Sequence, residues 1–219
     1  MKQIVIKAQS LVLLGCLLLT ANAAFCGDDV AKDVVVTAGK LGSSQQEERD
    51  YALKALAQQY EAVSVVCRSA LANAASQSRE DRRYHSPLHA AILAVRTWHV
   101  VDAESELLAV IDYTLDIHSV PVGKDLSGDF FFPAASALAY LRPHANKLES
   151  AINVADTPKK LRLLTWVLVQ REGNIEKAKT VLSGVRAKNA GGVARQNLDA
   201  ALTFLDSPSD LLPSFTDVR

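Results

Sequence analysis

The chain has 219 residues, with 24 basic and 24 acidic side chains, and only 6% of its residues are aromatic. This length suits one domain or one compact repeat array with a substantial core. The balanced charge offers no basic patch for nucleic acid or for an anionic membrane surface, which argues against both as partners. Abundant alanine and leucine with few aromatics favour packed helices over a β-sandwich.

Residues 1–23 have the features of a secretory signal peptide. Lys2 and Lys7 precede an apolar run over 11–19, and Ala21-Asn22-Ala23 supplies the small residues of a cleavage site. We therefore expect an exported protein, periplasmic or secreted, with no membrane insertion after cleavage. The run is too short to span a bilayer comfortably.

The three cysteines leave two alternatives open. Leu13-Leu14-Gly15-Cys16 resembles a lipobox, so a lipoprotein anchored through Cys16 is the alternative to cleavage after Ala23, although three leucines still follow that cysteine. Cys26 and Cys67 could pair in an oxidising compartment. The sequence favours a buried Cys67 and an unpaired Cys26, because Cys67 lies in an apolar helical pattern.

After the signal, the pattern predicts a flexible tail over 24–43, a helical domain over 44–206 and a C-terminal tail over 207–219. The first helical pattern runs from about residue 45 to 75, with apolar residues in steps of three and four. The charged stretch "SQSREDRRY" (76–84) is then expected to be a solvated connection.

The stretch "YHSPLHAAILAVRTWHV" (84–100) places His85 and His89 four residues apart, a spacing that on one helix can bind a metal ion. However, Ser86 and Pro87 predict the helix start, with serine as N-cap and proline at the first helical position. His85 then lies before the helix and His89 in its first turn. The two rings do not share a helical face, so we expect no bound metal ion. We also expect no cofactor of any other kind.

The remaining chain predicts further helix pairs. Asp102 is expected to cap a second helix after the first, and residues 116–132 form a long break. Helices are then expected from Pro133, over 146–155, and from Pro158 after a Thr157 cap. Two more helices follow, separated by Gly191-Gly192; the first begins after a Gly173 C-cap and an Asn174 N-cap.

The stretches "SPLHAAILAVRTWHVVDAESELLAVI" and "PAASALAYLRPHANKLESAINV" resemble degenerate HEAT-type helical repeats over about residues 84–206. Each has a helix rich in small residues, a short polar link and a second helix with leucine or isoleucine anchors. The resemblance implies an all-α fold of stacked antiparallel helix hairpins, a short α-solenoid with mobile N- and C-terminal tails, used as a binding scaffold. It implies no catalytic residue. A tetratricopeptide array is the alternative fold, but its 34-residue spacing is missing.

Catalytic motifs are missing from the sequence. It has no Gly-rich phosphate loop and no Gly-x-Ser-x-Gly elbow, and Asp112, Asp116 and His118 are best explained as solvated charges at a helix end. The leading hypothesis is an exported, non-enzymatic scaffold that binds another protein. The alternatives are a small periplasmic helical hydrolase or lyase whose site the sequence does not reveal, and an accessory that packs against a larger envelope complex.

The stretch "GDFFFP" (128–133) contains three adjacent phenylalanines, which cannot all face one core. Two of them could fill the junction between hairpins, since burying each contributes about 1.5–3 kcal/mol. Alternatively, at least one is exposed on a partner surface. Phe130 and Phe131 are therefore the candidate protein-binding residues.

Overall fold

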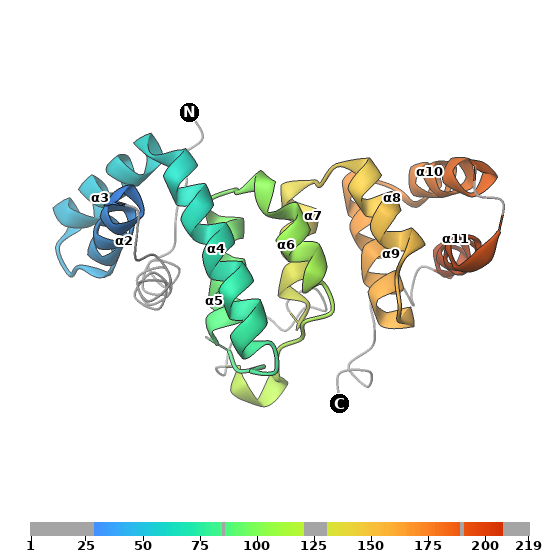
Figure 1. Ribbon diagram of the computed structural model, residues 1–219, viewed down its shortest axis with the longest axis horizontal. Helices are drawn as coiled ribbons and strands as arrows, with labels where there is room; N and C mark the ends of the chain where they lie inside the picture. The colour runs from blue at the N-terminus through green and yellow to red at the C-terminus, as the bar shows by residue number, and fades with distance from the viewer. Residues whose placement is uncertain (1–28, 85, 121–130, 189–190, 208–219) are drawn as a thin grey trace. The chain divides into compact units, whose positions relative to one another are not determined.

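The computed structural model describes residues 29–84, 86–120, 131–188 and 191–207 (Figure 1). Within these ranges the regular structure is entirely helical and contains no strand, which confirms the all-α fold class. The chain divides into two compact units, residues 1–106 and 107–219.

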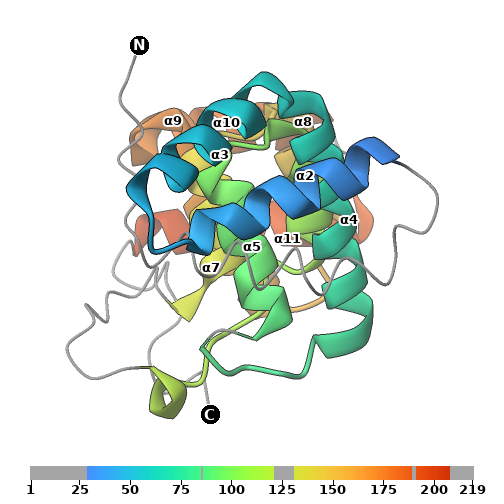
Figure 2. The same ribbon diagram turned by 90° about the vertical axis from the view of Figure 1, so that its left-hand side faces the viewer.

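The first unit begins with a helix where the sequence predicted a tail. Helix α2 (Asp29–Gly39) and the short turn η1 (Lys40–Gly42) pack against α3 (Gln46–Gln58), and α2 also crosses α4 (Tyr60–Ser78) (Figure 2). Four apolar side chains of this segment are buried: Val34, Val35, Ala38 and Leu41. The expectation of a flexible tail over 24–43 is therefore wrong for residues 29–42. The sequence alone showed no partner for these valines, because α4 lies far along the chain.

The helical pattern over 45–75 forms two helices rather than one, since α3 and α4 are interrupted at Gln59, whose φ of −110° and ψ of 36° are not helical. Helix α4 lies beside α5 (Pro87–Thr97) (Figure 1). The expected buried positions Leu88, Ile92 and Val95 are all fully buried. Asp102 lies within the turn η2 (Val101–Ala103), and the helix after it, α6 (Glu104–Ala109), is short.

The second unit contains the short turn η3 (Ile117–Ser119) and the helices α7 (Pro133–Leu141), α8 (Ala145–Asn153), α9 (Pro158–Glu172), α10 (Ile175–Lys188) and α11 (Gly192–Asp206). Across both units, Pro87, Pro133 and Pro158 each stand in the first turn of a helix, as predicted. Proline fits this place because its missing N–H would have no intrahelical partner there and its φ is already helical.

Local caps set the limits of α9 and α10. The Thr157 hydroxyl accepts the Lys160 N–H at 3.2 Å, and the Asn174 side-chain oxygen accepts the Lys177 N–H at 2.8 Å. Gly173 ends α9 in the left-handed conformation, with φ of 81°. All three caps were predicted from residue type and position alone.

Helices α8 and α9 pack together, and α11 contacts α8, α9 and α10. In Figure 1 these four helices lie next to one another in the second unit. The centre of this packing is aliphatic, and five leucines lose almost all of their exposed surface: Leu148, Leu164, Leu182, Leu198 and Leu205. Burial of these stripes, rather than intrinsic helix propensity, stabilises such short helices.

One side chain ties α11 to the end of α8. The Asn197 amide nitrogen donates to the carbonyl oxygens of Ile152, Asn153 and Ala155 at 3.0, 3.2 and 3.0 Å. These carbonyls lie where α8 ends and have lost the partners that a continuing helix would supply. Asn197 therefore fixes the register between two helices that are more than 40 residues apart in sequence.

We predict that Asn197→Asp lowers the free energy of unfolding by at least about 2 kcal/mol, because a carboxylate has no donor and would face three carbonyl oxygens. Gln196→Glu is the matched control. It adds the same charge at an exposed neighbouring position, and should change stability by no more than about 0.5 kcal/mol. Urea denaturation measures both. Equal losses in the two variants would show that the charge, and not the three carbonyl contacts, is responsible.

Candidate functional site

The turn after α5 combines a left-handed backbone conformation with exposed side chains. His99 has a φ of 54°, one of only two non-glycine residues with positive φ among those that the structure describes. The Tyr60 hydroxyl, at the start of α4, donates to the His99 carbonyl oxygen at 2.8 Å. A left-handed conformation is costly for a residue with a Cβ, and surrounding contacts have to hold it in place. Tyr60 provides one such contact.

The side chains around this turn are exposed although the backbone is fixed. Tyr60 is 40% exposed, Val101 is 38% exposed, and His99 is also exposed. We refer to these three residues as the Tyr60 surface. Partial burial raises the pKa of Tyr60; the nearby charge of Asp102 raises it further, and the backbone N–H of Val101 opposes the shift. The phenol is therefore neutral at physiological pH and keeps the proton that it donates to the His99 carbonyl oxygen.

The sequence does not reveal this surface. Steps of three and four place Tyr60 in line with Leu56 and Val63, and His99 in line with Ile92 and Val95, so the pattern predicts that both belong to buried helix faces. Helices often end in a glycine or asparagine in the left-handed conformation, but neither follows Thr97 at the end of α5. This missing cap residue is the one sign in the sequence that another residue must adopt that conformation here. What the sequence does not show is Tyr60, which lies 39 residues earlier and supplies the hydrogen bond.

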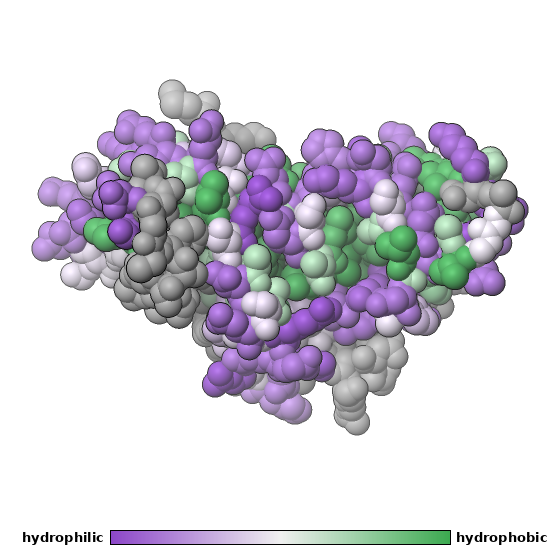
Figure 3. Space-filling model, in the orientation of Figure 1, coloured by the Kyte–Doolittle hydropathy of each residue, from purple (hydrophilic) through white to green (hydrophobic). Residues whose placement is uncertain are grey.

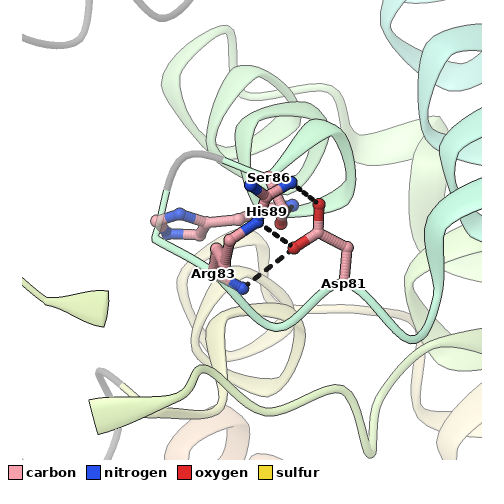
Figure 4. A network of polar contacts seen from close by, with 4 residues as sticks. All are labelled: Asp81, Arg83, Ser86 and His89. Atoms are coloured by element: carbon pink, nitrogen blue, oxygen red, sulfur yellow. Dashed lines mark hydrogen bonds and ion pairs between the residues drawn. The ribbon is translucent and has the colours of Figure 1, made fainter. Parts of the chain in front are cut away.

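The expected helix start at Ser86 is present in the structure. The Ser86 hydroxyl accepts the His89 N–H at 3.3 Å, and Pro87 follows the cap. Just before it, Asp81 accepts hydrogen bonds from the Arg83 backbone at 3.2 Å and from its guanidinium at 2.9 and 2.8 Å (Figure 4). The side-chain hydrogen bond from Arg83 lowers the pKa of Asp81. This network fixes the connection that leads into α5.

His89 is a packing residue in this network. It is only 2% exposed, and its ring lies 5.0 Å from that of Tyr84 at an interplanar angle of 49°. His85, the other histidine of the four-residue spacing, lies outside the described residues. Among the residues that are described, no group of three or more His, Cys, Asp or Glu side chains is placed to hold a metal ion.

The two predicted protein-binding residues have different outcomes. Phe130 lies outside the described residues. Phe131 is 2% exposed and Phe132 is 1% exposed, so both fill the core of the second unit. The Leu115 N–H donates to the Phe131 carbonyl oxygen at 3.1 Å, which anchors the backbone here. Phe131 therefore presents no surface to a partner in this conformation.

The Asp116 and His118 pair is a local turn. An Asp116 carboxylate oxygen accepts the His118 backbone N–H at 2.9 Å, and the Ser119 hydroxyl donates to the Asp116 carbonyl at 2.7 Å. Both contacts are exposed and stabilise the chain reversal at η3. This agrees with the expectation of solvated charges at a helix end.

A second apolar feature lies in the second unit. Val154, at the end of α8, is 76% exposed, and Val193, at the start of α11, is 64% exposed. Hydrophobic side chains are visible over α8 and α11 in Figure 3. Isolated exposed aliphatic side chains are common on protein surfaces and do not by themselves mark a binding site.

Cys67 is a free thiol, fully buried in α4, and burial raises its pKa to about 12. A group with a raised pKa stays protonated below that value, so almost no thiolate is present at neutral pH. Cys16 and Cys26 lie outside the described residues, so a disulfide bond between Cys26 and Cys67 is not described.

We predict that Cys67 in a Cys26→Ala variant of the protein without its signal reacts with a thiol reagent at pH 8 at least about 100-fold more slowly in the folded state than in urea, because the native thiol is both inaccessible and protonated. The absorbance of the released chromophore measures the rate. A native rate close to the denatured rate would contradict the burial of this thiol.

Comparison with known proteins identifies no relative of this chain. No protein-family model matches the sequence, and neither the curated proteins nor the solved structures contain a match. Among the described residues, no helix is both long enough and apolar enough to cross a membrane.

Proposed function

We propose that the protein is an exported, non-enzymatic helical scaffold that binds another protein through the Tyr60 surface. The observation that carries this proposal is the Tyr60–His99 hydrogen bond, which holds a left-handed turn rigid while the tyrosine ring remains 40% exposed. Tyrosine is enriched among the residues that dominate binding energy at protein interfaces. A fixed backbone also lowers the entropy lost on binding.

The surrounding framework supports a scaffold role. Helices α4 and α5 pack as a pair in the first unit, and α8 with α9 and α10 with α11 do so in the second. We propose that these pairs are degenerate repeats of the HEAT type. In such folds each pair packs against its neighbours, and the stack presents an extended binding surface. The Tyr60 surface combines the start of α4 with the residues that follow α5.

Export is the second element of the proposal, and it rests on Lys2, Lys7, the apolar run over 11–19 and the Ala21-Asn22-Ala23 pattern. We predict that the exported protein begins at Ala24. Intact-mass spectrometry of the protein recovered from the producing cell checks this. A mass that retains Cys16 and includes acyl chains would establish the lipoprotein alternative instead.

We predict that Tyr60→Ala reduces partner capture at least about tenfold, as expected for a central aromatic contact. The experiment captures partners from the exported fraction with the tagged wild-type protein or a variant as bait and quantifies them by mass spectrometry. Tyr51→Ala is the matched control, because Tyr51 is also an exposed tyrosine of the first unit, at 64%. Equal capture by both variants would contradict a role for the Tyr60 surface.

Tyr60→Phe separates the ring from its hydroxyl group. This variant keeps the aromatic surface but loses the bond to the His99 carbonyl. We expect it to lose about 0.5–1.5 kcal/mol of stability and to bind more weakly than wild type but better than Tyr60→Ala. Circular dichroism should show the same helix content in all of these proteins.

A further inference from the structure

We propose that the Tyr60 surface binds a positively charged segment of the partner protein, with a lysine or arginine side chain placed over the Tyr60 ring near the acidic residues Asp102 and Glu61. This inference rests on the proposed function and specifies the chemistry of the partner. It follows from the charges next to the ring and from the cations that lie over other aromatic rings of the chain.

The charges next to Tyr60 are negative and unpaired. Asp102 acts on Tyr60 through its charge, and Glu61 is the next residue of α4; both are exposed. Neither forms an ion pair with any residue that the structure describes. By contrast, Glu106 of the same unit is neutralised by Arg68 at 2.7 Å. The two acids beside Tyr60 therefore leave a local negative potential.

Other aromatic rings of the chain already have a cation over one face. Lys40 lies 5.6 Å from the ring centre of Tyr51, Lys159 lies 5.6 Å from that of Phe132, and Arg162 lies 5.1 Å from that of Phe204. No described cation occupies the Tyr60 ring in this way. The face of an aromatic ring is negative and attracts cations, and the nearby negative charge of Asp102 strengthens that attraction.

The same charges select against other partners. Two uncompensated carboxylates repel the phosphates of nucleic acids and of anionic lipid headgroups, so neither suits this surface. A basic peptide segment satisfies the acids, the ring and the apolar Val101 together, because lysine and arginine combine an aliphatic stem with a charged end.

The experiment titrates the full chain without its signal with octalysine and, separately, with octaglutamate, and follows binding by calorimetry and by backbone amide chemical shifts. We expect octalysine to bind and to shift the amides of His99, Val101 and Asp102 most strongly. Octaglutamate should not bind. If octalysine does not bind, or if the largest chemical-shift changes lie elsewhere in the chain, the proposal is wrong. This test uses the unaltered sequence, so it does not depend on whether a variant folds.

A paired comparison separates the site from general charge. Glu61→Gln with Asp102→Asn should weaken octalysine binding about five- to tenfold, the expected effect of two partly screened charges. Glu47→Gln with Glu48→Gln removes the same charge from exposed positions on α3, and should change the affinity less than about twofold. Equal losses would overturn the proposal in favour of non-specific attraction.

The two proposals fail in different ways. Partner capture that depends on Tyr60, without octalysine binding, would reject the basic segment and leave the protein-binding surface in place. Octalysine binding at the Tyr60 surface, with capture unaffected by Tyr60→Ala, would instead reject the proposed function of that surface.

Discussion

Short helices leave many backbone carbonyl groups without an intrahelical partner, and side chains from distant helices satisfy several of them here. Asn197 donates to three carbonyls at the end of α8, Tyr60 donates to the carbonyl of His99, and the Arg171 guanidinium donates to the carbonyl of Pro143 at 2.7 Å. A polar backbone group hidden from water without a partner costs about 1–3 kcal/mol. These contacts therefore decide which turns the packed helices can adopt.

Within the described part of the chain, the two non-glycine residues with positive φ show how this constraint operates. His99 and Arg142 have φ values of 54° and 55°, and each lies at a turn whose carbonyl group receives a side-chain hydrogen bond. At Arg142 the acceptor is the carbonyl of the following residue, Pro143. Glycine would adopt these conformations without cost, whereas these residues need support from another helix. Rigidity at such turns comes from tertiary contacts.

This difference also explains how far the sequence could predict the structure. Pro87, Pro133 and Pro158 were recognisable as helix starts, and Gly173 and Asn174 as caps, because each acts within one turn of the chain. The helix over 29–39 and the Tyr60 surface were missed, because both depend on partners far along the sequence. The same limit applies to Asn197, whose three acceptors lie 42 to 45 residues away. Periodicity gives the buried face of a helix but not its neighbour.

The aromatic residues show the same limit in the candidate site. The run of adjacent phenylalanines was a predicted binding surface because it is strongly apolar. A large apolar surface, however, stabilises a small unit most when it is buried. Phe131 and Phe132 are buried accordingly. Tyr60 is isolated in sequence, and its hydroxyl has a structural acceptor while its ring stays exposed beside unpaired acids. Because core formation does not require that exposure, this ring is the better candidate for recognition.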